Sequence, residues 1–151
     1  MKFRTLSRLV TTTLLALVLA STALVANVQG AAALSTAANA DVQYGNNNCG
    51  DLVMGAPVIG TVRFVRNGDQ VQLRYVMSAG DANTQYAVHL FDADTCGSFG
   101  KVASFATNGA GVGRSASRLV SVAASDRFYA VAFDTSNFVG LSHGSLAVDL
   151  P

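Results

Sequence analysis

The sequence predicts a single all-β domain, an antiparallel β-sandwich of about seven to eight strands, behind an N-terminal signal peptide. Strong helix formers are scarce: the chain has no glutamate and, after residue 40, only one lysine, whereas valine, threonine, phenylalanine and tyrosine recur. Short apolar-alternating runs follow one another and are separated by Gly, Asn, Asp and Ser. The 111 residues at 41–151 suit one domain with one core.

Residues 1–40 are expected to form the signal peptide and a small-residue leader. Three basic residues precede an apolar run at 9–26, which is the pattern of a secretory signal. An A-x-A pattern predicts cleavage before Asp41; cleavage within 26–33, or retention of the apolar run as a membrane anchor, are the alternatives. We therefore expect a secreted or cell-surface protein, with no stable membrane span once the signal is removed.

Cys49 and Cys96 are the only cysteines of the chain. An even pair in an exported protein predicts a disulfide, and the alternative is two free buried thiols. Closing such a loop stabilises a fold by roughly 4 kcal/mol in the chain-entropy model.

The first strands are predicted as a β-hairpin at 60–78. Two alternating runs flank Asn67-Gly68, the dipeptide that type I′ turns prefer. This turn sets Arg66 opposite Asp69, Phe64 opposite Val71, Val62 opposite Leu73 and Arg63 opposite Gln72. Apolar residues then meet on one face and polar residues on the other, so the pattern supports the pairing.

Later strands are expected at 85–91, 101–107, 114–122, 127–134 and 145–150, with a further short one at 52–54. In the strand at 85–91, Tyr86, Val88 and Leu90 form the stronger apolar set. His89 should therefore point away from the core.

A resemblance to known families spans about Gly60 to Gly113. The runs "GTVRFVRNGDQVQLRYVMS", "YAVHLFDADTC" and "FATNGAGVG" resemble small secreted bacterial β-sandwich proteins with immunoglobulin-like or transthyretin-like folds, many of them without an assigned activity. They are similar, less closely, to copper/zinc superoxide dismutases and to CHRD domains. The dismutase resemblance implies an H-x-H pair in the strand at 85–91; only His89 matches it, and Ala87 or Phe91 stands where the second histidine belongs.

A metal site has weak candidates in His89, Asp92 and Asp94. Copper prefers several imidazoles, and the chain has two histidines. Calcium takes six to eight oxygens, whereas two aspartates flanking an alanine more commonly solvate a loop. We expect no cofactor.

The second histidine, His143, falls in a predicted loop at 134–144. If each connection reverses direction, this loop and the one after the strand of His89 lie at opposite ends of the sandwich, roughly 20 Å apart. The two histidines should then not share a site. The letters at 140–144 spell G-x-S-x-G around Ser142, but a nucleophile elbow needs a following helix and downstream acid and histidine partners.

Charge argues against nucleic acid as a partner. From residue 41 onward the chain has seven basic and nine acidic residues, a net charge of −2. The arginines are scattered along the sequence, whereas binding to phosphate backbones needs clustered positive charge.

Apolar residues in predicted loops are the candidate ligand-binding positions: Phe99 in one loop, and Phe138 and Leu141 in another. Loop tips on a rigid sandwich commonly carry function, although such residues also fold back as lids on the core. The expected function is a non-catalytic binding or surface-interaction module for an unknown extracellular glycan or protein. A divergent dismutase-like metal protein and a structural envelope or matrix component are the alternatives.

Overall fold

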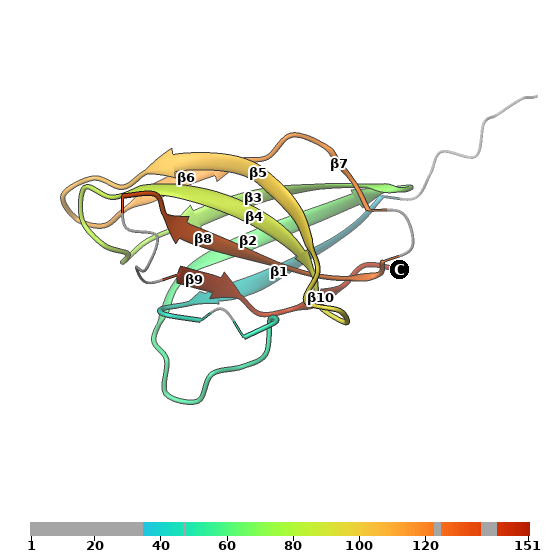
Figure 1. Cartoon of the computed structure of the whole chain (residues 1–151), viewed down its shortest axis with the longest axis horizontal. Coiled ribbons are helices and arrows are strands. Elements are labelled where there is room, and N and C mark those ends of the chain that lie inside the picture. Colours follow the sequence, from blue (N-terminus) through green and yellow to red (C-terminus); the bar gives the residue numbers. More distant parts are fainter. Residues whose placement is uncertain (1–34, 47, 123–124, 137–141) are drawn as a thin grey trace, which may run out of the picture. The chain divides into compact units, whose positions relative to one another are not determined.

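The computed structural model describes residues 35–46, 48–122, 125–136 and 142–151, which fold as antiparallel β-structure within one compact unit (Figure 1). The predicted signal peptide lies outside the described residues, apart from the end of its leader. Ten strands occur in the described part of the chain: β1 (Thr36–Gln43), β2 (Val58–Asn67), β3 (Gln70–Met77), β4 (Gln85–Asp92), β5 (Ser98–Ala106), β6 (Gly113–Ala116), β7 (Val120–Ser121), β8 (Arg127–Asp134), β9 (Ser142–Ser145) and β10 (Val148–Asp149). Among these residues there is no helix that is long and apolar enough to cross a membrane.

The strands form one curved sheet in the order β5-β4-β8-β9-β1-β2-β3-β6, with β10 beside β8 and β7 beside β3. Its two ends approach each other, because a Cβ atom on Gly113 of β6 would lie 2.6 Å from the ring of Phe105 on β5. The run β3-β6-β5-β4 has Greek-key order. Two halves of the sheet thus face each other across one core, and the predicted all-β antiparallel sandwich fold is confirmed.

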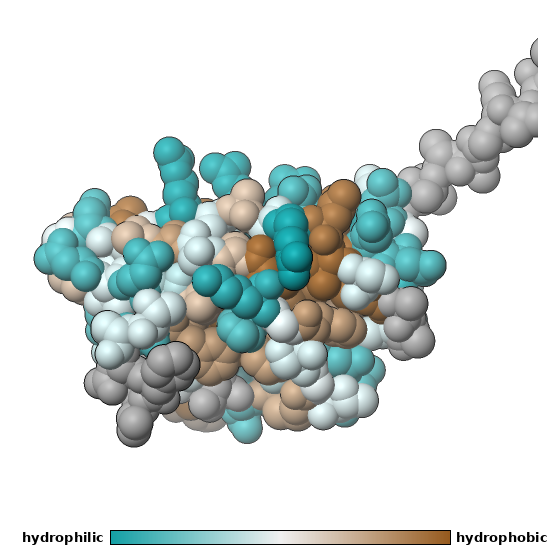
Figure 2. Space-filling model, turned by 45° about the horizontal axis from the view of Figure 1, so that its top comes forward, coloured by the Kyte–Doolittle hydropathy of each residue, from teal (hydrophilic) through white to brown (hydrophobic). Residues whose placement is uncertain are grey.

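The core is built from the inward-facing side chains of both halves. Figure 2 shows the outside of the domain over β5, β6 and β3, where hydrophilic side chains stand out beside a hydrophobic area. The fully buried large side chains include Val62, Phe64, Leu73, Tyr75, Met77, Tyr86, Leu90 and Phe128. Burying each of the aliphatic and phenyl groups contributes about 1.5–3 kcal/mol. Tyr86, Val88 and Leu90 point inward as the alternation predicts.

The β2–β3 hairpin exists, but its turn differs from the predicted one. Asn67 pairs with Gln70, so the two turn residues are Gly68 and Asp69. Only Gly68 has a positive φ, of 58°, which fits a type II′ turn with glycine first rather than a type I′ turn. The register is therefore shifted by two residues from the predicted one.

A two-residue shift leaves every side chain on its predicted face, because the side-chain period of a strand is two. Alternation alone therefore could not reveal the error. In the structure Arg66 faces Val71, Phe64 faces Leu73, Val62 faces Tyr75 and Arg63 faces Arg74. The last pair sets two positive charges directly opposite each other.

Strand β1 is the largest element that the sequence did not predict. Its first five residues, Thr36–Ala40, precede the expected start of the domain at Asp41. They pair with Val62–Arg66 of β2, and the end of β1 pairs with β9 on its other side. Small residues that resembled a signal-peptidase site are thus the first part of β1, paired with β2.

Three other boundaries also differ. Residues 52–54 form no strand, and Met54 is 89% exposed. The strand expected at 114–122 is interrupted, giving the short strands β6 and β7. Three residues at 142–144, expected to be in a loop, form β9 together with Ser145, the first residue of the predicted last strand. Later in that predicted strand, Val148–Asp149 pair with β8 as β10.

The predicted disulfide between Cys49 and Cys96 is confirmed. It joins the segment after β1 to the loop between β4 and β5, and the two cysteines are 47 positions apart in sequence. Both cysteines have positive φ, 50° and 56° respectively. The bond therefore ties two turns to each other at one end of the sheet.

Replacing both cysteines by serine is expected to lower the free energy of unfolding by about 2–4 kcal/mol, because the unfolded chain regains the entropy of the open loop. Urea unfolding of the oxidised protein and of the double variant measures the difference. Dithiothreitol should destabilise the original protein and leave the variant unchanged. Equal midpoints for the oxidised protein and the variant would contradict this role of the bond.

Candidate functional site

The structure describes one of the three predicted ligand-binding residues, Phe99. Phe99 lies within β5, is half-buried, and packs against the core with its ring centroid 6.1 Å from that of Phe128. Phe99 therefore covers the core, which is the alternative to ligand binding expected from the sequence. Phe138 and Leu141 lie outside the described residues.

The weak metal candidates are not brought together either. His89 lies in the middle of β4, whereas Asp92 at its end accepts hydrogen bonds from the N–H groups of Asp94 and Thr95. These bonds lower the pKa of Asp92 below its usual value. Asp94 forms an ion pair with Arg127 at 3.0 Å. In the described part of the chain no three His, Cys, Asp or Glu side chains meet in a cluster that could hold a metal ion.

The two histidines are closer along the sheet than predicted, yet they still do not share a site. His143 lies in β9 and pairs with Ala132 of β8, which in turn pairs with Val88 of β4. His143 is therefore two strands away from Val88, a distance of roughly 10 Å. His89 is the next residue of β4 and points to the other face. The predicted end-to-end separation of about 20 Å was wrong because β9 runs back along β8 instead of forming a loop.

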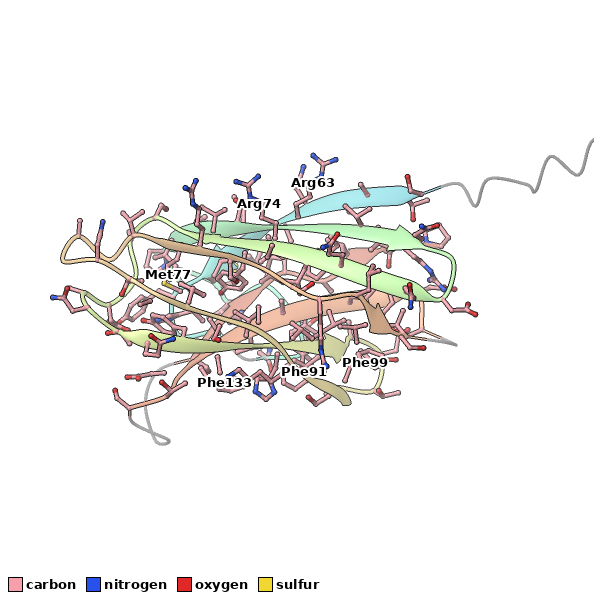
Figure 3. All side chains as sticks on the ribbon, turned by 90° about the horizontal axis from the view of Figure 1, so that it is seen from above. Arg63, Arg74, Met77, Phe91, Phe99 and Phe133 are labelled. Atoms are coloured by element: carbon pink, nitrogen blue, oxygen red, sulfur yellow. A yellow bond between two sulfur atoms is a disulfide. The ribbon has the colours of Figure 1, made fainter. Side chains whose placement is uncertain are left out.

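His89 belongs to an aromatic patch on the outer face of β4 and β8, formed by His89, Phe91, Tyr129 and Phe133. Its ring centroids lie 5.3 Å from that of Phe133 and 6.3 Å from that of Phe91. The ring of Phe91 stacks on Tyr129 at 5.0 Å. Figure 3 shows Phe91 and Phe133 on the side of the domain opposite Arg63 and Arg74. These rings are held by paired strands, so they form a preorganised surface.

One side of the aromatic patch is polar and open. Ser98 of β5 lies opposite Phe91, and Lys101 lies opposite His89; both are exposed. The other side is covered, because Tyr129 is 3% exposed and a Cβ atom on Gly50 would lie 2.9 Å from its Cβ. The segment held by the disulfide thus packs over Tyr129, and His89, Phe91 and Phe133 remain partly exposed.

His89 stays neutral at physiological pH. Burial lowers the pKa of His89 below its ordinary value, and the positive charge of Lys101 acts in the same direction. The imidazole therefore presents an uncharged ring beside the two phenylalanines at pH 7.

A second polar constellation is a tyrosine–histidine cluster made of Tyr44, Asp81, Tyr86 and His143, in which Tyr86 and His143 are buried, Tyr44 is partly buried and the side chain of Asp81 is 37% exposed. Tyr86 donates from its hydroxyl to Oδ2 of Asp81 at 2.8 Å, and Tyr44 donates to Oδ1 at 3.1 Å. His143 places Nε2 3.1 Å from Oδ2 of the same carboxylate. The N–H of Gly45 donates to Nδ1 of His143 at 3.1 Å, which assigns the proton of the neutral ring to Nε2.

Burial and hydrogen bonding shift the pKa values of Asp81 and His143 in opposite directions. Burial raises the pKa of Asp81, but hydrogen bonds from Tyr86, His143 and Tyr44 outweigh it, so the pKa lies below its usual value. Burial lowers the pKa of His143, and contact with Asp81 opposes that effect only in part. Burial and the hydrogen bond to Asp81 raise the pKa of Tyr86. At neutral pH the cluster therefore holds a carboxylate, a neutral imidazole and neutral phenols.

This arrangement leaves no reactive group free. Both ring nitrogens of His143 are engaged, and its side chain is fully buried. Ser142 next to it is 7% exposed and belongs to β9, so it sits on no strand-to-helix turn. The cluster instead links the end of β1, the loop before β4, β4 itself and β9.

Sequence reasoning missed both groups of residues. The aromatic patch combines residues from two strands about 40 positions apart, and the alternation in the strand at 85–91 placed His89 outward without indicating which other rings would lie beside it. Aromatic rings recur at outward-facing positions of both strands: His89 and Phe91 on the first, Tyr129 and Phe133 on the second. This recurrence was a signal from which the patch could have been predicted. The tyrosine–histidine cluster has no local motif, because its members lie between five and 99 residues apart in sequence.

The chain matches no protein-family model, no curated protein and no solved structure.

Proposed function

We propose that the protein is a non-catalytic extracellular binding module that binds a glycan on the aromatic patch. The observation that carries the proposal is a set of partly exposed aromatic rings, His89, Phe91 and Phe133, in mutual contact on rigid paired strands. The resemblance to small secreted β-sandwich proteins, together with the disulfide, supports an extracellular location.

The chemistry of the patch suits a sugar. One face of a pyranose ring is apolar and stacks on aromatic side chains, whereas its hydroxyl groups need hydrogen-bond partners at the rim. Ser98, Lys101 and Ser104 stand on the neighbouring strand directly opposite residues of β4 and are exposed. A hydroxyl donates and accepts, and an ammonium donates three hydrogen bonds, so this rim matches sugar hydroxyls.

The size of the patch also favours a glycan over a protein partner. A stable protein interface buries about 800 Å² on each side and uses roughly 20–30 residues. Three partly exposed rings beside a short polar rim are much smaller than that. Neutral His89 supports stacking as well, because no buried positive charge has to be desolvated when the sugar binds.

Catalysis has little support from the polar groups in the described residues. The contact between His143 and Asp81 resembles a general-base pair, but both nitrogens of the imidazole are already bonded. The nearest hydroxyl to Nε2, that of Tyr86, has a raised pKa and donates to the carboxylate. A base without a free lone pair abstracts no proton from a substrate.

Replacing Phe91 and Phe133 by leucine is expected to weaken glycan binding by about tenfold for each ring, roughly 1.4 kcal/mol. Leucine keeps apolar volume, so the fold should remain. The probes are cello-oligosaccharides, chito-oligosaccharides, xylan and mannan, and isothermal titration calorimetry of the full chain measures affinity. Leu119→Ala changes a side chain that is 54% exposed and lies outside the patch, and this control should bind like the original protein.

Two outcomes contradict the proposal. One is a full chain that binds none of these glycans although its circular dichroism spectrum is that of a folded β-protein. The other is binding that is unchanged in the Phe91→Leu, Phe133→Leu double variant, because a bound glycan would then contact another surface.

A further inference from the structure

The arginines that are scattered along the sequence are segregated in the folded domain. Arg66 and Arg127 form ion pairs with aspartates. Arg63, Arg74, Arg114 and Arg118 form none with any acid in the described part of the chain, and all four are exposed; the first three lie on neighbouring strands. We call these three residues the basic face.

Strand pairing brings the basic face together. Arg63 of β2 lies directly opposite Arg74 of β3, and Arg114 of β6 pairs with Val76, two residues from Arg74 on the same face. Directly opposite side chains have Cβ atoms about 4.5–5.5 Å apart and diagonal ones about 7–8 Å. Three guanidinium groups thus follow one another across three neighbouring strands.

Figure 3 shows Arg63 and Arg74 projecting from the domain on the side away from Phe91 and Phe133. Figure 2 shows hydrophilic side chains rising over the part of the surface formed by β5, β6 and β3. The basic face is therefore separate from the aromatic patch.

This placement destabilises the free domain. Like charges directly opposite each other on a sheet repel. The acid nearest to them on this face of the strands is Asp41, which pairs with Thr61 and so lies diagonal to Arg63 without forming an ion pair. An anionic ligand that bridges the guanidinium groups would remove the repulsion.

We infer that the basic face binds an acidic polysaccharide, through its carboxylate or sulfate groups. Arginine binds planar oxyanions by two parallel hydrogen bonds, and all three charges here are arginines. Regularly repeated anions along an extended polymer match a row of cations across adjacent strands. This inference concerns a different surface from the proposed glycan site and does not depend on it.

The basic face fits an acidic polysaccharide better than a nucleic acid. Binding of single strands uses aromatic side chains on which bases stack. The outward residues beside the arginines, Asn39, Thr61, Gln72 and Val76, include no aromatic ring. A broad sheet face also has no helix or two-stranded ribbon to enter a major groove.

The test measures binding of the full chain to heparin and to polygalacturonate by calorimetry, at low and at physiological ionic strength. The triple variant Arg63→Gln, Arg74→Gln, Arg114→Gln should bind at least tenfold more weakly than the original protein, with a shallower dependence on salt. The matched single variants are Arg74→Gln and Arg127→Gln. The first should weaken binding, and the second, which removes the same charge elsewhere, should not.

The melting temperature of the variants without ligand shows whether a loss of binding comes from a loss of folding. Arg74→Gln relieves the repulsion with Arg63, so its melting temperature without ligand should be equal to or slightly above that of the original protein. Equal loss of binding in Arg74→Gln and Arg127→Gln would overturn the inference, because net charge alone would then explain the affinity. So would absence of binding at low salt, or tighter binding to double-stranded DNA or to anionic phospholipid vesicles than to either polysaccharide.

Discussion

A chain that begins at Asp41 is expected to be much less stable than one that begins at Ala33. Removing Thr36–Ala40 deletes more than half of β1, namely most of the part that pairs with β2, and leaves the pairing of Val42 and Gln43 with β9. The backbone groups of Val62–Arg66 would lose their partners on that side.

The expected loss is several kcal/mol. Each backbone hydrogen bond contributes about 0.5–1.5 kcal/mol, and a domain of this size is stable by only about 5–15 kcal/mol. Ala40 is buried and Ala38 packs against the core, so some apolar contact disappears as well. The shortened chain should melt at least about 10 °C lower or fail to fold.

Thermal unfolding followed by circular dichroism compares the two chains, both with the disulfide formed. Equal melting temperatures would contradict the importance of β1. The same comparison bears on processing: cleavage before Asp41 would divide an interior strand, whereas cleavage within 26–33 would leave it whole. If the apolar run is removed as a signal peptide, we therefore expect the cleavage point to precede Thr36, which N-terminal sequencing of the purified protein determines.

Asp81→Ala is expected to lower the free energy of unfolding by about 2–4 kcal/mol, because three donors lose a charged acceptor. The hydroxyl of Tyr86 and the Nε2–H of His143 are buried and lose their charged acceptor; the one contact left between them is the 3.3 Å contact that the two groups make with each other. Asp69→Ala at the exposed hairpin turn is the matched control and should change stability little. Similar melting temperatures for the two variants would contradict a stabilising role for the tyrosine–histidine cluster.

The cluster also predicts acid sensitivity. The pKa of His143 is lowered on folding, so as pH falls below about 6.5 the unfolded chain takes up a proton that the folded one does not. Stability should therefore fall from that pH downward. The lowered pKa of Asp81 adds a second loss, which begins near its ordinary value and proceeds as pH falls through the folded value. Urea unfolding between pH 7.5 and 4 measures this, and His143→Phe should be flatter between pH 7 and 5.

Sequence patterns predicted what depends on local alternation. The inward set of β4, the outward position of His89 and the all-β antiparallel fold follow from side-chain periodicity and composition. The pairing of Cys49 with Cys96 follows from there being only two cysteines.

What the sequence could not predict depends on distances between strands. The hairpin pattern is the same in two registers that differ by two residues, yet only one of them sets Arg63 against Arg74. His143 looked like a loop residue, because Ser142–Ser145 are small and polar; their burial comes from packing beside β8. Thr36–Ala40 resembled a cleavage site because small residues serve equally well in an interior strand and before a signal peptidase.

An amide chemical-shift titration of the 15N-labelled chain with the cello- and chito-oligosaccharides decides whether the aromatic patch is the binding site. The expected result is a set of saturable shifts centred on His89, Phe91 and Phe133 and extending to the facing residues of β5, with little change on the opposite side of the domain. Shifts centred on Arg63 and Arg74, or no shift with any of the sugars, would contradict the proposed function.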